Sequence, residues 1–132
     1  MKDVLAELVE NENFDGAAEH CLRNENSEYT VIAQKRVVNF CIKQGASKEN
    51  ISNVITELLR KKEFKKAEPF MDFVSSNTLL AESVESNWPD GINYALRKGA
   101  DNFDFAIFKA IQSDNHSLAE FLAYKKKKHF GL

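Results

Sequence analysis

The apolar residues of this chain recur at helical spacing along nearly its whole length. The clearest stretch places five of them at positions i, i+3, i+4, i+7 and i+8, namely Ile51, Val54, Ile55, Leu58 and Leu59. On an α-helix these positions share one face, which is then buried against a neighbouring element. No segment sustains the alternation of apolar and polar residues that is typical of a half-buried strand. The sequence therefore predicts an all-α fold without a substantial sheet.

We expect about nine helices, joined by short connections that make neighbours pack antiparallel. The predicted ranges are 2–10, 14–24, 28–44, 48–61, 65–75, 79–86, 89–98, 104–113 and 117–128. Four polar residues stand where N-terminal caps are needed, namely Ser47, Thr78, Asp104 and Ser117. Pro69 lacks a backbone N–H, so its helix must start late or bend there.

The predicted helix 28–44 differs from the others because apolar residues surround most of its circumference. They are Val31, Ile32, Ala33, Val37, Val38, Phe40, Cys41 and Ile42. A helix of this kind is usually buried between layers. We therefore predict that it forms the spine of the core.

Two segments at the ends of predicted helices have nearly the same sequence. They are "VVNFCIKQGAS" at 37–47 and "GINYALRKGAD" at 91–101, which begins 54 positions later. A glycine just past a helical stripe suits the left-handed conformation that ends many helices, so we expect this conformation at Gly45 and Gly99. A second matching pair, "ELVENENFDGA" and "ELLRKKEFKKA", is spaced by 50 positions. Internal repeats of this length are typical of helix pairs stacked into a solenoid.

The stretch "TLLAESVESNWPDGINYALRKGAD" at 78–101 resembles an ankyrin repeat without gaps. Thr78 and Leu80 match the opening Thr and Leu of that repeat, and Gly-Ala-Asp at 99–101 matches its end. Residues 110–124 resemble the second half of a following unit. The resemblance implies stacked helix pairs that bind other macromolecules.

Residues 5–24, with "GAAEHCLRN" at 16–24, more weakly resemble the first helix pair of the MA3 domains of translation regulators. That family also implies stacked helix pairs with macromolecular partners. We therefore expect residues 1–132 to form a single helical-repeat domain with a basic C-terminal end at 125–132. Its architecture is expected to be a short α-solenoid, either ankyrin-like or like HEAT repeats and MA3 domains.

The composition is that of an ordinary globular protein. Of the 132 residues, 43% are hydrophobic and 29% are charged, which is too apolar for a disordered chain. The longest uninterrupted apolar run is 105–108, far too short to span a membrane. The N-terminus lacks the basic and then apolar pattern of a signal peptide. We expect an intracellular protein, cytoplasmic or nuclear.

Nothing in the sequence has the spacing of a catalytic, cofactor or metal site. His20, His116 and His129 are the only histidines, and none belongs to a recognised ligand motif. Cys21 and Cys41 are the only cysteines, and both lie on apolar helical stripes, which predicts buried thiols rather than a disulfide or a zinc site. The few glycines lie mostly at helix ends and leave no phosphate-binding loop. We expect no enzyme, cofactor or metal.

Charge is distributed unevenly although the net charge is only −2. Residues 1–30 carry eight acidic residues against Lys2 and Arg23. The basic residues form two clusters, Arg60, Lys61, Lys62, Lys65 and Lys66 in the first and Lys125, Lys126, Lys127 and Lys128 in the second. An acidic beginning and a basic end also allow head-to-tail self-association.

The leading functional hypothesis is a non-enzymatic scaffold or adaptor that binds another protein or a peptide. Trp88 and Phe103 lie at helix junctions, where they serve either as exposed contact anchors or as plugs between helix pairs. The alternative is an RNA-associated regulatory module that uses the two basic clusters. Against it stand simpler roles for the clusters, namely a solvated helix junction and a polar cap on the stack.

Overall fold

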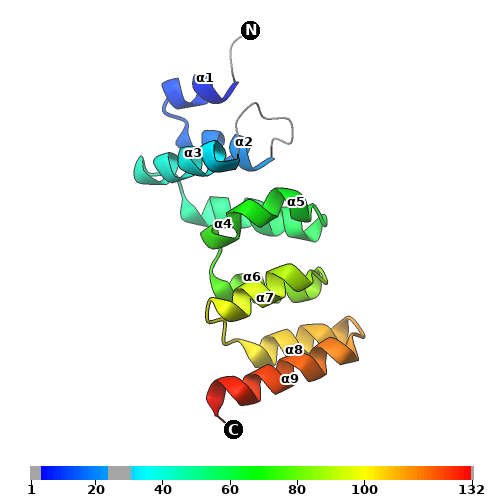
Figure 1. Cartoon of the computed structure of the whole chain (residues 1–132). Coiled ribbons are helices and arrows are strands. Elements are labelled where there is room, and N and C mark those ends of the chain that lie inside the picture. The colour runs from blue at the N-terminus through cyan, green and yellow to red at the C-terminus, as the bar shows by residue number, and fades with distance from the viewer. Residues whose placement is uncertain (1–3, 24–30, 132) are drawn as a thin grey trace. The chain divides into compact units, whose positions relative to one another are not determined.

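The computed structural model describes residues 4–23 and 31–131, and the regular elements in these ranges are all helices, without a strand. The helices are α1 (Val4–Glu10), α2 (Phe14–Arg23), α3 (Val31–Lys43), α4 (Lys48–Arg60), α5 (Phe64–Ala67), the 3₁₀ helix η1 (Glu68–Phe73), α6 (Ser76–Glu85), α7 (Pro89–Arg97), α8 (Phe103–Gln112) and α9 (His116–Phe130), as Figure 1 shows. The all-α prediction is confirmed for this part of the chain. The predicted helical positions 2–3, 24 and 28–30 lie outside it.

The helices group into two compact units. The first, Met1–Val74, contains α1 to η1, and the second, Ser75–Leu132, contains α6 to α9. In the first unit α2 packs against α1, α3 and α4, and in the second α6 packs against α7 and α8 while α8 packs against α9. Helices that follow one another therefore pair within each unit. The expectation of one domain over residues 1–132 stays a prediction.

One backbone turn recurs at the ends of six helices. After α6, the N–H of Asn87 donates to the carbonyl of Val84 at 3.1 Å, and the N–H of Trp88 donates to that of Ser83 at 2.8 Å. This is the Schellman pattern, in which one left-handed residue ends the helix. The left-handed residues are Glu12, Gly45, Lys62, Asn87, Gly99 and Asp114, all with positive φ.

The two glycines among them, Gly45 and Gly99, have the left-handed conformation that the sequence predicts for them. Gly45 has φ +107° and Gly99 has φ +93°, values that L side chains rarely adopt. In both turns the following alanine donates its N–H to a carbonyl of the helix, at 2.9 Å from Ala46 and 3.0 Å from Ala100. The two similar sequences therefore build the same local structure, one in each unit.

Of the four predicted N-terminal caps, one is confirmed. Ser47 accepts a hydrogen bond from the N–H of Asn50 at 3.2 Å and caps α4. The other three positions are wrong because their helices begin earlier than predicted. The residues that occupy the N-cap positions there are Ser75 for α6, Asn102 for α8 and Asn115 for α9.

Pro69 has the predicted effect on the helix that contains it. The α-helical turn of α5 ends at Ala67, and the chain continues as the 3₁₀ helix η1. Because Pro69 has no N–H to donate, the regular α-helical ladder cannot pass through this position. The predicted helix 65–75 is therefore a short α-helix joined to a 3₁₀ helix.

The prediction that helix 28–44 is buried between layers is wrong for the described helix α3. Val38 and Cys41 are fully buried, but Ile32 is 67% exposed and Phe40 is 44% exposed. The helix is apolar on two opposite faces, and the first unit covers only one of them. The other face becomes part of a surface described below.

The two cysteines are buried and neither forms a disulfide, as the sequence predicts. Burial raises the pKa of the Cys41 thiol, with a smaller contribution from the nearby carboxylate of Asp15. A thiol with a raised pKa stays protonated and unreactive at neutral pH. Cys41 therefore serves as a small core residue.

Candidate interaction surfaces

An apolar groove lies between α1 and α3 in the first unit. It has a volume of about 440 Å³ and is lined by Leu5, Ala6, Val9, Glu10, Arg36, Val37 and Phe40, a set we call the α1–α3 groove. The ring of Phe14, at the start of α2, supports Phe40 in an edge contact with centroids 5.9 Å apart. The floor of the groove is therefore preformed, while the Phe40 ring still meets solvent. A groove of this kind between two helices suits the apolar face of a partner helix.

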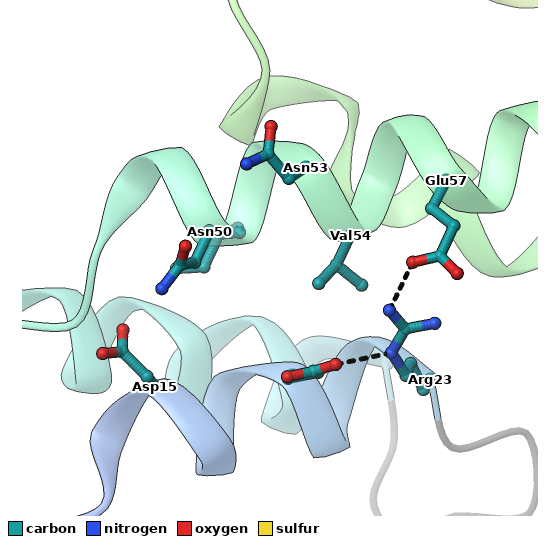
Figure 2. A pocket seen from close by; sticks show the side chains of 8 residues that line it. Asp15, Arg23, Asn50, Asn53, Val54 and Glu57 are labelled. Carbon is teal, nitrogen blue, oxygen red and sulfur yellow. Dashed lines mark hydrogen bonds and ion pairs between the residues drawn. The ribbon is translucent and has the colours of Figure 1, made fainter.

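A second, polar groove lies between α2 and α4. Figure 2 shows its lining side chains, and its volume is about 330 Å³. Arg23 lies at one end of it, where Nε donates to Glu19 at 2.9 Å and Nη2 donates to Glu57 at 2.5 Å. At the other end, the carboxylate of Asp15 accepts the N–H of Ser47 at 2.7 Å. These contacts tie α2 to α4, and the charged side chains of the groove already have partners in one another or in the backbone.

The electrostatics of the polar groove follow from these pairs. Hydrogen bonds from Arg23 and then Lys61 hold the pKa of Glu57 below its usual value. Hydrogen bonds to Glu57 and Glu19 raise the pKa of Arg23, so that its guanidinium stays charged at any practical pH. Since all three side chains are partly exposed, solvent screens the pairs and each contributes little. We interpret this groove as a structural clamp between helices.

The clamp predicts a specific dependence of stability on pH. Because the pKa of Glu57 is lower in the folded state, its contribution is complete above the unfolded value of about 4.3 and is lost as the pH falls through the folded value. Wild type should therefore lose more stability than Glu57→Gln between about pH 5 and pH 3. Urea unfolding at several pH values measures this difference.

The matched control is a double-mutant cycle with Arg23→Gln. In the Arg23→Gln background, Glu57→Gln should change the pH dependence of the free energy of unfolding less than it does in wild type. The reason is that Arg23, the main partner of Glu57, is already absent. Equal effects in both backgrounds would show that Arg23 and Glu57 do not stabilise each other.

The first basic cluster is largely engaged within the first unit. Lys61 pairs with Glu57 at 3.2 Å, and Lys66 pairs with Glu63 at 3.5 Å. Lys62 is the left-handed residue of the turn between α4 and α5. The cluster therefore lies at a helix junction, and Lys61 and Lys66 have acidic neighbours of their own.

The second basic cluster combines lysines with aromatic rings on one face of α9. Lys125 lies 5.5 Å from the ring centroid of Phe121, and Lys128 lies 5.5 Å from that of Tyr124. These four residues, spaced i, i+3, i+4 and i+7, form what we call the α9 stripe. Lys126 points elsewhere, to Asp104 of α8 at 2.7 Å.

The same pairing occurs on α7. Lys98 lies 5.5 Å from the ring centroid of Tyr94, and Arg97 lies 5.9 Å from it. Tyr94–Lys98 and Tyr124–Lys128 share the i, i+4 spacing, so helices α7 and α9 present equivalent cation–aromatic pairs. The sequence could have revealed these pairs through their spacing.

Trp88 and Phe103 are buried rather than presented to solvent. Trp88 is 5% exposed and Phe103 is 3% exposed. Phe103 packs near the rings of His129 and Phe130, with centroids 5.4 and 6.1 Å away. The role of an exposed contact anchor is therefore wrong for both residues, and neither ring is part of the surfaces proposed below. The contacts of Phe103 with α9 lie within one helix pair, so a plug between neighbouring pairs stays a prediction.

Other large hydrophobic residues are exposed instead. Phe105, Phe108 and Ile111 occupy one side of α8, and each is about half exposed. Sequence reasoning missed them because a helix that is apolar on two faces does not tell which face is covered. Two ion pairs border this side of α8, between Lys109 and Glu85 and between Lys126 and Asp104.

Within residues 4–23 and 31–131, no group of three or more His, Cys, Asp or Glu side chains could hold a metal ion. No helix in this part of the chain is long and apolar enough to cross a membrane. Comparisons with protein-family models, curated proteins and solved structures find no match. In the part of the chain that the structure describes, the regular elements are all helices, and helices that follow one another pack together in pairs.

Proposed function

We propose that this chain is a protein-binding module built from degenerate helical repeats. The observation that carries the proposal is the α1–α3 groove, whose apolar floor and exposed Phe40 suit a partner's amphipathic helix. The polar groove is a weaker candidate, because its charges already pair with one another.

The recurring Schellman turn supports the repeat interpretation. The turn joins the two helices of four pairs, α1–α2, α4–α5, α6–α7 and α8–α9, and α3 lies between the first two of these pairs. Glycine turns of the same pattern follow α3 and α7. A helix–turn–helix unit repeated in this way is the basis of an α-solenoid, and the ankyrin resemblance of residues 78–101 fits such a unit.

A pull-down with three baits tests the proposal. All three baits carry Tyr124→Lys, so that the aromatic side of α9 does not contribute to binding. The bait with an intact groove and the bait with Phe108→Lys should recover the same stoichiometric protein partner, while the bait with Phe40→Lys should lose it because an ammonium group then enters the apolar groove. Phe108 is the matched control, since it is an exposed phenylalanine on α8, outside the groove. Failure of all three folded baits to recover a partner, or equal recovery by all three, would contradict binding through the groove.

The cation–aromatic pairs on α9 favour a second candidate function, binding of single-stranded RNA. Lysines that lie beside aromatic side chains supply both phosphate contacts and stacking surfaces. The net charge of −2 limits general affinity for nucleic acid, so binding would depend on this helix.

If the RNA candidate is right, affinity should fall about tenfold or more between about 50 and 200 mM salt, because several phosphates release counterions. Substituting Lys125 to Lys128 with serine should weaken binding to a similar extent at the lower salt. Fluorescence anisotropy with labelled single-stranded RNA measures both effects. Affinity that changes with neither salt nor substitution would remove this candidate.

A further inference from the structure

We propose that the α1–α3 groove accepts the α9 stripe of a second copy of this chain, so that copies associate head to tail. The inference rests on the proposed protein-binding function and names the partner of the same groove. Each half of the contact lies within one compact unit, the groove in the first and the stripe in the second.

The apolar parts of the two surfaces match. Phe121 and Tyr124 project from α9 on the side away from Ala119 and Leu122, which are buried in the second unit. The α1–α3 groove offers Leu5, Val9, Val37 and Phe40 as an apolar floor. A helix that lays its aromatic stripe into this floor would cover Phe40 and Tyr124 together, and both are about half exposed in the single chain.

The charges match as well. Glu10 lies at the α1 edge of the groove, and Glu7 is exposed on the same helix. Lys125 and Lys128 of the α9 stripe carry the complementary charge. The acidic Glu10 beside the groove therefore faces basic residues beside the aromatic stripe, which favours this partner over an acidic one.

On the other side of the contact the charges have the opposite signs, so that the groove carries a positive charge and α9 carries a negative one. Arg36 lines the groove from α3. On α9, exposed Glu120 precedes Tyr124 by one turn and lies on the side of the stripe away from Lys125. A single orientation of α9 therefore sets Lys125 against Glu10 and Glu120 against Arg36. The exposed side of α8 does not offer this pattern, because its neighbouring charges pair within the second unit.

A contact between two different surfaces is heterologous, so it either closes into a ring or continues to add copies. Light scattering at rising protein concentration should show masses at or above twice the 15.0 kDa of one chain. The mass should fall towards 15.0 kDa at about 1 M salt, where the Debye length is only ~3 Å.

Two single substitutions separate the halves of the contact. Phe40→Lys blocks the groove, and Tyr124→Lys blocks the stripe, so each variant alone should stay at 15.0 kDa. An equimolar mixture should form a 1:1 pair that grows no further, since one variant keeps its stripe and the other its groove. Phe108→Lys, with the same exposed fraction of 54% as Tyr124, should associate like wild type.

Circular dichroism of each variant checks that it is folded. The charge reversals Glu10→Lys and Lys125→Glu provide a second test of the contact. Each reversal alone should weaken association, and the two together in one chain should restore it. A wild-type mass of 15.0 kDa at every concentration would overturn the proposal. So would association that nuclease abolishes, which would assign the α9 stripe to RNA. Either result leaves the pull-down with Phe40→Lys as an independent test of the groove.

Discussion

Replacing Gly91 with alanine should destabilise the protein, although alanine is the better helix former. In an open helix position the change would stabilise by up to about 1 kcal/mol. A Cβ atom at Gly91, however, would lie 2.5 Å from Cε3 of Trp88 and closer still to the Oγ of Ser83. Both side chains are buried where α6 meets α7, so neither moves aside easily. Crowding of this kind costs about 1–3 kcal/mol and should outweigh the gain in helix propensity.

Gly16→Ala is the matched control, because Gly16 and Gly91 are each the third residue of their helix, α2 and α7. A Cβ atom at Gly16 would meet only the side chain of Asn13, at 2.6–2.9 Å. That side chain is exposed and can rotate away, at the expense of its hydrogen bond to the Gly16 N–H. Urea unfolding should therefore show a nearly neutral change for Gly16→Ala. Unchanged or higher stability for Gly91→Ala would show that α6 and α7 are not packed closely.

Ser83→Ala identifies the atom responsible for the crowding. The buried Oγ of Ser83 has no hydrogen-bond partner among the described residues, so its removal alone should cost little. In the double variant with Gly91→Ala, the loss should be smaller than the sum of the single losses, with a coupling of about 0.5–3 kcal/mol. Additive losses would place the crowding at Trp88 instead.

Local sequence signals predicted most of the helix pattern. Apolar periodicity located the helices, and glycines in positions that require positive φ located two of the six turns. The other four turns use Glu12, Lys62, Asn87 and Asp114. Asn and Asp adopt the left-handed conformation more readily than Glu and Lys, but all four residue types are also common in helices and loops, so none of them marks this conformation as glycine does. These four turns were placed correctly because the connections between apolar stripes are short. The predicted N-cap positions were less accurate than the helices themselves, since Ser, Asn and Asp occur at several positions near each helix start.

Exposure could not be predicted in the same way, because it depends on which elements surround a helix. Phe40 and Phe108 have the spacing of core residues, but each lies on the uncovered side of a helix that is apolar on two faces. Trp88 lies at a junction like an exposed anchor, but α6 and α7 enclose it. The α1–α3 groove combines residues about 30 positions apart, and no local pattern relates them.

Leu58→Ala should destabilise the protein more than Gly91→Ala, with a loss of about 2–5 kcal/mol in the free energy of unfolding. Leu58 is 1% exposed and belongs to α4, which packs against α2, α5 and η1. Removing its side chain leaves a cavity that three neighbouring helices cannot all close. Because a domain of this size is stable by only about 5–15 kcal/mol, the variant should unfold at clearly lower urea concentration.

Leu8→Ala is the matched control for Leu58→Ala, and it also tests how deeply α1, which forms one side of the α1–α3 groove, is buried. Leu8 occupies the equivalent position in "ELVENENFDGA" to that of Leu58 in "ELLRKKEFKKA", but it is only half-buried. Helix α1 packs chiefly against α2, so fewer atoms surround Leu8 and its removal should cost clearly less. A loss equal to that of Leu58→Ala would mean that α1 is embedded as deeply as α4. The α1–α3 groove would then be part of a closed core, and no partner helix could bind there.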